Sequence, residues 1–286
     1  IFFTGMPDPI MDLCGGIVET IWSDSANTGR ASVEYDTSDD AMVYASYSEG
    51  FKVGGINGND CNPPWDPETV ASYEVGYKAT LNDGATTLSA SAFHYDYSDF
   101  QVAQVIGIVG IIVNAGDATI DGFELEVTSN VGDDWTLSAG LTLLDSAYGE
   151  FLNTDALQGD AGVLQNKGNP LNKTPEQSLN VGIVRNMTFD SGANLALSLN
   201  TAYRSRTYFR EFGQIDDSQA AYTVVNFNAN FETADELFTT RFFVTNATNE
   251  AYITDLSTGD SQYGRHASWG MPRHIGIELT RHFGTR

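Results

Sequence analysis

Basic residues are scarce in this sequence. It has 38 Asp and Glu against 14 Lys and Arg in 286 residues, and its formal net charge is −24. This balance repels phosphate backbones, which excludes nucleic acid as a partner, and the chain is not expected to dock by itself on anionic lipid head groups. The acidic residues are spread along the chain, which fits solvated loops and a wet interior better than a disordered tail.

The sequence also lacks any apolar run of about eighteen residues, which excludes a transmembrane helix. A transmembrane strand is still compatible with the sequence, because it needs only about 9–11 residues and only alternate ones are apolar. The chain begins with Ile1 and has no cationic segment before an apolar core, so we expect that a signal peptide was removed or not included. Two cysteines, Cys14 and Cys61, are too few for a zinc site.

The main pattern is an alternation of apolar and polar residues with a period of two. From Trp135 to Leu143, every odd position is apolar and every even position is small or polar. The stretch 274–283 alternates in the same way, with Ile275 and Ile277 on its apolar face. Helical spacing is nowhere sustained, so the sequence predicts an all-β fold.

Short turns and long connections alternate along the chain. The short polar turns are at 38–40, 82–84, 132–134, 190–192 and 235–236. The long connections are at about 54–67, 106–112, 152–173, 212–220 and 255–266. Together they predict about eleven antiparallel strands, and a transmembrane β-barrel sorts its connections in this way, short on the periplasmic side and long outside.

The two strand faces differ in polarity. Charged and amide side chains on one face would be costly in a dry core but are ordinary in a water-filled or plugged lumen. They are Glu74, Lys78, Glu124, Glu126, Asn226, Asn228, Asn230 and Arg241. Aromatic residues on the other face fit interfacial girdles, and a β-sandwich with an aromatic core is the alternative.

Five segments between residues 44 and 283 carry further motifs. They are Tyr44–Asn57, Trp65–Lys78, Asn114–Glu126, Val244–Tyr252 and Pro272–Phe283. Their motif residues are Gly50, Phe51, Gly54, Gly55, Asn57, Pro67, Glu68, Glu74, Gly76, Lys78, Asn114, Gly116, Gly122, Glu124, Glu126, Asn246, Tyr252, Pro272, Arg273 and Phe283. In this order the segments resemble the TonB-dependent receptors, the outer-membrane importers of siderophores and other scarce nutrients.

The resemblance implies a barrel of about 22 strands around a plug domain. This chain then supplies residues 1–24 as an external loop or partial strand and residues 25–286 as the C-terminal half of the barrel, without the plug. We therefore expect a fragment. Its implied partners are the missing plug and N-terminal barrel half, outer-membrane lipids and lipopolysaccharide, and, through the absent N-terminal part, the inner-membrane TonB energy transducer.

The function that the resemblance implies is import of a scarce nutrient, such as a ferric siderophore, across the outer membrane. The alternative is a complete passive channel of about 12 strands, with residues 15–22 as the extra strand. An enzyme barrel predicts clustered Ser/His or Asp/His groups at one rim, and the sequence shows none. A soluble acidic binding protein is the remaining class. Which nutrient is carried does not follow from the residues.

No catalytic group, cofactor site or metal site stands out in the sequence. Arg204, Arg206 and Arg210 are spaced to share a strand face near an external end, and they are notable in a chain with so few cations. One hypothesis is that they attract an anionic ligand or a lipopolysaccharide phosphate, and the other is that they pair with neighbouring acidic loops.

Two features of the predicted external loops stay open. Cys14 and Cys61 fall in neighbouring external loops, so they either form a disulfide or are unrelated thiols. The loop carboxylates Asp216, Asp217, Asp255 and Asp260 either bind calcium or are simply solvated.

Overall fold

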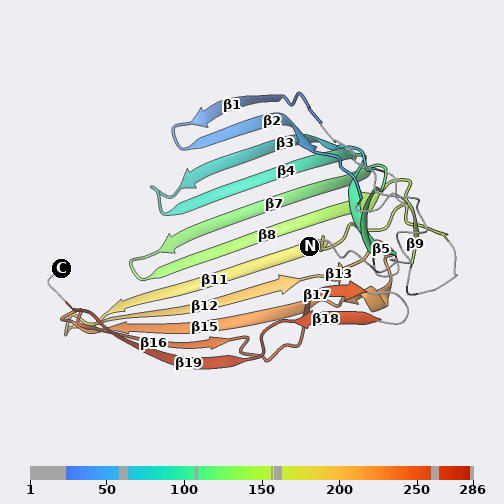
Figure 1. Cartoon of the computed structure of the whole chain (residues 1–286). Helices are drawn as coiled ribbons and strands as arrows, with labels where there is room; N and C mark the ends of the chain where they lie inside the picture. Colours follow the sequence, from blue (N-terminus) through green and yellow to red (C-terminus); the bar gives the residue numbers. More distant parts are fainter. Residues whose placement is uncertain are drawn as a thin grey trace.

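The computed structural model describes residues 24–57, 64–106, 109–155, 157, 163–258 and 264–283. In this part of the chain, eleven long strands form one antiparallel sheet, and each pairs with the next long strand in sequence (Figure 1). They are β1 (Arg30–Ser38), β2 (Ala41–Lys52), β3 (Glu68–Leu81), β4 (Thr86–Ser98), β7 (Ala118–Val131), β8 (Trp135–Tyr148), β11 (Gln177–Thr188), β12 (Asn194–Arg204), β15 (Tyr222–Glu232), β16 (Phe238–Thr245) and β19 (His274–Arg281). The prediction of an all-β chain with about eleven strands is confirmed.

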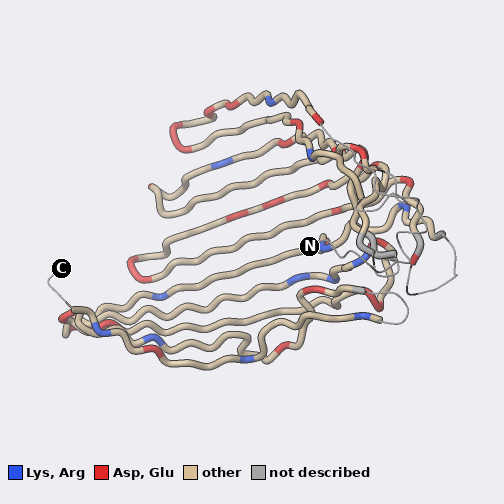
Figure 2. The backbone as a smooth tube through the Cα atoms, in the orientation of Figure 1, with Lys and Arg blue, Asp and Glu red and all other residues tan. Residues whose placement is uncertain are grey.

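Short turns join these strands at one end of the sheet, which we call the turn end. The turn between β3 and β4 contains Asn82, Asp83 and Gly84, at φ 55°, 55° and 92°. Asn, Asp and Gly adopt this left-handed backbone most easily, so the residues that predicted the turn also form it. The turns between β1 and β2 and between β7 and β8 are acidic (Figure 2).

The opposite end of the sheet, the loop end, carries the long connections. Four of them contain small two-stranded hairpins, which Figure 1 shows gathered at this end. The hairpin strands are β5 (Gln101–Ile106), β6 (Val109–Asn114), β9 (Leu152–Thr154), β10 (Val163–Gln165), β13 (Thr207–Tyr208), β14 (Ser218–Gln219), β17 (Ile253–Thr258) and β18 (Arg265–Trp269), and a 3-10 helix η3 spans Ile215–Asp217. The predicted alternation of short and long connections is therefore present.

One predicted boundary differs from the structure. The sequence pattern places a connection at about 106–112, whereas the sheet strand β4 already ends at Ser98 and β5–β6 forms a separate hairpin. Asp99, at φ 54°, turns the chain out of the sheet. The apolar residues on both sides of this point hide the break, because a hairpin arm and a sheet strand show the same run.

The sheet has a polar face and an apolar face. Tyr44 donates a hydrogen bond of 2.5 Å from its hydroxyl to Glu74 on the neighbouring strand, so both lie on the polar face. Residues of the opposite register are solvent-exposed apolar side chains, such as Val33 at 72% and Ile277 at 74%. This exposed apolar surface matches a sheet whose outer side contacts lipid.

Three polar-face glycines lie beneath aromatic rings of the neighbouring strand. They are Gly76 beneath Tyr44, Gly122 beneath Phe93 and Gly276 beneath Phe243. A Cβ built on Gly122 would lie 2.1 Å from the Phe93 ring. The rings cover backbone that a glycine leaves bare, as cross-strand aromatic residues do in curved sheets.

The buried apolar core lies at the loop end rather than within the sheet. It consists of Val102, Ala115, Ala118, Tyr148, Phe151 and Leu171. These residues come from the ends of β7 and β8 and from the connections 99–117 and 149–176. The core therefore packs the connections 99–117 and 149–176 over the ends of β7 and β8.

Among the described residues, β1 pairs only with β2, and β19 pairs only with β16. The sheet thus has two open edges. No helix in this part of the chain is long and apolar enough to span a membrane.

Candidate functional site

The motif residues are distributed over the sheet and its loop end. Gly50 and Phe51 lie in β2, Glu68, Glu74, Gly76 and Lys78 in β3, Gly122, Glu124 and Glu126 in β7, and Asn114 at the end of β6; Gly54, Gly55, Asn57, Pro67, Gly116, Asn246, Tyr252, Pro272 and Arg273 lie in the connections, and Phe283 follows β19. The loop end therefore holds most motif residues that are outside the long strands.

Two motif asparagines join the connection 53–67 to the β5–β6 hairpin. Asn57 forms two hydrogen bonds with the backbone of Ile112, at 2.8 and 3.0 Å. Asn114 accepts from the amide of Asp66 at 2.7 Å and donates to the carbonyls of Asp66 and Asp99. An amide side chain has both a donor and an acceptor, so each asparagine can replace a missing backbone partner.

Asn246 organises the last connection in the same way. It is 3% exposed and sits at φ 49°, just after β16. Its side-chain amide donates to the carbonyls of Glu250 and Met271 at 2.8 and 3.0 Å and accepts from the amide of Glu250. One side chain therefore closes the start of the connection 246–273 against its end.

A set of ion pairs around two buried aspartates links three of the long connections, and we call it the loop clasp. The Arg210 guanidinium donates to Asp155 at 2.5 Å and to Asp217 at 2.8 Å, and the Arg265 Nε donates to Asp217 at 2.5 Å. Asp155 and Asp217 are 1% and 0% exposed. These residues belong to the connections 149–176, 205–221 and 246–273, so the clasp holds three loops together.

In the loop clasp, the positive charges of Arg210 and Arg265 balance the negative charges of Asp155 and Asp217. Burial alone lowers the pKa of the Arg210 guanidinium, but the hydrogen bonds and charges of Asp155 and Asp217 outweigh burial and raise it. The ring of Phe212 lies 4.6 Å from the guanidinium and covers its face. Glu211 is also buried, and Asn153 donates a hydrogen bond to it.

A pocket of about 430 Å³ lies at the loop end of the polar face, and we call it the rim pocket. Its lining includes Lys173, Arg204, Tyr222, Asn226 and Tyr252. The rings of Tyr222 and Tyr252 are stacked, with centroids 4.5 Å apart and an interplanar angle of 11°. The rim pocket thus combines two cations, a pair of flat aromatic rings and an amide.

The cations of the rim pocket differ in their surroundings. Lys173 forms an ion pair of 2.8 Å with Asp255, and this hydrogen bond lowers the pKa of Asp255. Arg204 lies opposite Tyr222 in the sheet register and makes no ion pair with a described residue. Arg204 is therefore the cation best placed to meet an anion in the rim pocket.

The structure separates the three arginines that the sequence grouped. Because β12 ends at Arg204, the three do not share one strand face. Arg206 donates to the Ser218 hydroxyl at 2.8 Å within the β13–β14 hairpin, and Arg210 pairs with acidic loop residues in the loop clasp. Nothing in the sequence pattern indicated that Lys173 and Tyr222 would lie near Arg204, because strand pairing and loop closure bring these residues together.

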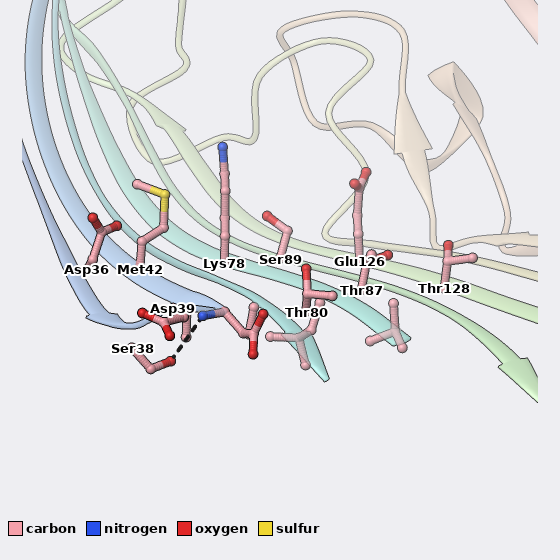
Figure 3. Close-up of a pocket in the computed structure, with 15 residues that line it drawn as sticks. Asp36, Ser38, Asp39, Met42, Lys78, Thr80, Thr87, Ser89, Glu126 and Thr128 are labelled. Atoms are coloured by element: carbon pink, nitrogen blue, oxygen red, sulfur yellow. Dashed lines mark hydrogen bonds between the residues drawn. The ribbon is translucent and has the colours of Figure 1, made fainter. Parts of the chain in front are cut away.

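A second hollow, of about 660 Å³, lies at the turn end. Lys78, Ser89 and Glu126 line it and point to the same side of the sheet in Figure 3. The cross-strand order of β3, β4 and β7 places these side chains in one row. The polar face is therefore hydrophilic down to the turn end.

Of the loop carboxylates, Asp217 is buried and paired with Arg210 and Arg265 rather than solvated, and Asp255 pairs with Lys173. Cys14, Cys61 and Asp260 lie outside the described residues. In the described part of the chain, no group of three or more His, Cys, Asp or Glu is arranged to hold a metal ion.

Comparisons with known proteins now identify the family. The family model described as TonB dependent receptor-like, beta-barrel matches residues 15–247. The ferric-pyoverdine BN7/BN8 receptor of Pseudomonas putida is 25% identical over 246 residues, which is 86% of this chain and 27% of the relative. The probable TonB-dependent siderophore receptor PiuA of Acinetobacter baumannii is 29% identical over 128 residues, which is 42% of this chain and 17% of the relative.

Solved structures show the same fold. The ferric yersiniabactin uptake receptor FyuA of Yersinia pestis superposes with a TM-score of 0.73 at 21% identity, covering 88% of this chain and 36% of that one. The siderophore receptor PiuA of Acinetobacter baumannii gives 0.70 at 19% identity, covering 87% and 35%. This chain thus spans about a quarter of the length of the curated Pseudomonas relative and about a third of these solved chains.

The family consists of outer-membrane β-barrel receptors rather than enzymes. Within such a barrel the polar face of the sheet lines the lumen, the apolar face meets lipid, and the long connections are external. The chain therefore belongs to the TonB-dependent receptor family and forms part of its β-barrel.

Proposed function

We propose that the full-length receptor containing this chain imports a ferric siderophore across the outer membrane and that the rim pocket takes part in capturing it. The support is the family match, together with relatives that are named as siderophore receptors. The iron complex is the cargo and not a cofactor of the protein. In this proposal the present chain supplies the external rim and part of the wall of the lumen.

The rim pocket suits a bulky anion with flat groups. The Arg204 guanidinium offers paired N–H donors to carboxylate or phenolate oxygens. The stacked rings of Tyr222 and Tyr252 offer an apolar surface, and Asn226 adds an amide that can donate or accept. The observation that carries this proposal is the position of Arg204 beside the stacked tyrosines, at the loop end of the polar face.

The rest of the polar face fits a wall that contacts a plug. Lys78 and Glu126 line the hollow at the turn end, where a plug domain would meet the sheet (Figure 3). In this proposal the ligand binds at the rim, and movement of the plug, driven through the inner-membrane TonB transducer, opens the lumen. The plug and the TonB contact are supported by the family match alone.

The test uses the full-length receptor in an iron-starved Gram-negative host that lacks its own siderophore receptors. Uptake of radioactive iron is measured with ferric yersiniabactin and ferric pyoverdine as probes, with and without TonB. We expect TonB-dependent uptake of at least one ferric siderophore. Arg204→Gln should raise the KM of uptake roughly 10- to 150-fold, because a charged hydrogen bond to the ligand contributes on the order of 1.5–3 kcal/mol.

Arg206→Gln is the matched control, because Arg206 lies two residues further along, bonds Ser218 and does not line the rim pocket. Equal effects of the two substitutions would remove the rim pocket from the proposal. Uptake without TonB, accompanied by ion conductance of the purified protein in a planar bilayer, would overturn energised import in favour of a passive channel.

A further inference from the structure

On the apolar face of the sheet, basic and acidic residues lie at opposite ends of the strands. The face of each residue follows from the strand registers. Among the described residues of the eleven long strands, the basic residues on this face are Arg185 and Arg281, both near the turn end. The acidic residues on this face are Glu49, Asp96, Asp121 and Asp145, all near the loop end.

Both arginines lie against aromatic rings. Arg185 is opposite Trp135 in the register of β8 and β11, and its guanidinium carbon lies 5.1 Å from the indole centroid. Arg281 is opposite Phe238 in the register of β16 and β19, at 5.6 Å, and lies 4.8 Å from the ring of Phe283. The same arrangement thus occurs at two separate places. In each, the residue that begins a strand is aromatic and lies opposite an arginine of the neighbouring strand.

Neither arginine makes an ion pair with a described residue, although acidic turns lie close by. Aromatic rings at this height sit at the boundary between the acyl chains and the head groups of a membrane. A ring that covers the face of the guanidinium leaves its edge, with the N–H donors, uncovered. Such an edge matches a phosphate, which accepts two parallel hydrogen bonds.

We propose that Arg185 with Trp135, and Arg281 with Phe238 and Phe283, bind the head-group phosphates of anionic phospholipids in the periplasmic leaflet. This inference rests on the proposed function, because it takes the turn end of a membrane-inserted barrel to face the periplasm. The occupant is a phospholipid because lipopolysaccharide occupies the opposite leaflet. At the loop end, which would lie in the lipopolysaccharide leaflet, the charged residues that the described strands carry on the apolar face are carboxylates, which do not bind phosphate.

The net charge of −24 does not conflict with this inference. A negative chain is repelled by an anionic surface when it approaches from water. An inserted barrel instead meets individual head groups at fixed heights, where the charge of the adjacent side chain dominates over distant, screened charges. Local arginines can therefore hold phosphate although the whole chain is acidic.

The experiment is native mass spectrometry of the detergent-solubilised full-length receptor titrated with phosphatidylglycerol. We expect Arg185→Gln and Arg281→Gln each to weaken lipid binding roughly fivefold, and the double variant to lose both strong sites. Trp135→Leu should weaken the Arg185 site, because the ring no longer orients the guanidinium.

Arg241→Gln is the matched control. Arg241 also lies over an aromatic ring, at 5.1 Å from Phe243, but it is on the polar face and donates to Asn228. Phosphatidylglycerol binding by this variant should equal that of the unchanged receptor. Equal losses in Arg241→Gln and the two outward variants, or no loss in any, would overturn the proposal.

Two further measurements keep the result interpretable. Heat-dependent migration in gels shows whether each variant is folded before lipid is added. Siderophore uptake by the unchanged receptor tests the proposed function separately, so lipid binding without uptake would contradict only the proposed function. Uptake with unaltered lipid binding in Arg185→Gln and Arg281→Gln would contradict only the lipid sites.

Discussion

Arg210 is the residue on which the loop end most directly depends. It connects two carboxylates that are almost fully buried, Asp155 and Asp217, and Asp217 also binds Arg265. Burying charges costs free energy, and the clasp offsets this cost only while every charge is matched. The sequence left two hypotheses open for Arg210, binding of an anionic ligand and pairing with acidic loop residues. The structure shows the pairing with acidic loop residues.

We predict that Arg210→Ala in the full-length receptor loosens the loop end without unfolding the sheet. Removing the guanidinium leaves the buried carboxylates of Asp155 and Asp217 without this partner. It should lower the free energy of local unfolding at the loop end by about 3 kcal/mol. Amide hydrogen exchange should become about 100-fold faster at Phe209, whose amide donates to the Asp217 carbonyl. Adding Asp155→Asn and Asp217→Asn to Arg210→Ala should recover part of the protection, and exchange equal to that of the unchanged receptor would contradict the role of the clasp.

At the scale of elements, the long strands could be predicted and the hairpins could not. Alternation over 135–143 and 274–283 marks strands with one wet and one apolar face, because each side chain is then sorted by its surroundings. The β5–β6 hairpin packs residues such as Val102 into the core at the loop end, so its run resembles a continuing strand. Only the left-handed Asp99 marks the break.

The candidate site was predictable to a smaller extent. Arg204 stood out because cations are rare in the chain. Lys173, Tyr222 and Tyr252 lie far from it in sequence and meet it through the register of β12 and β15 and the folding of two connections. Contacts of this kind depend on loop closure, which the alternation of residues does not encode.

The ion pair between Lys173 and Asp255 joins the connection 149–176 to the β17–β18 hairpin, and it should depend on pH. The hydrogen bond from Lys173 holds the pKa of Asp255 below its ordinary value. The pair therefore stabilises the hairpin above the unfolded pKa of about 4, and the contribution disappears as the pH falls through the lower folded pKa. Both side chains are more than half exposed, so the contribution is below about 1 kcal/mol.

Limited digestion of the full-length receptor with pepsin measures this pair. Above pH 4, Asp255→Asn should be cut in the β17–β18 hairpin about two to three times faster than the unchanged receptor. The two rates should converge as the pH falls below about 4, because the unchanged carboxyl becomes protonated. Comparing the two proteins at each pH removes the pH dependence of the protease itself. A rate ratio that stays constant over the whole range would contradict the assignment to Asp255.

For the whole molecule, the open edges of the sheet determine what this chain can do by itself. The described residues leave one side of β1 and one side of β19 without strand partners. Each unpaired backbone group costs several kcal/mol in a lipid environment, so a stable barrel must supply partners for both edges. A larger receptor barrel supplies them from additional strands, whereas a small channel would have to close on itself.

Amide hydrogen exchange in detergent micelles distinguishes these two solutions. We expect that, in the isolated chain, alternate amides of β1 and β19 exchange rapidly, while the central strands β7 and β8 stay protected because both their edges are paired. In the full-length receptor the same edge amides should be protected. Protection of both edges in a monomer of the isolated chain would instead support the passive channel of about 12 strands, closed by residues 15–22, which lie outside the described part of the chain.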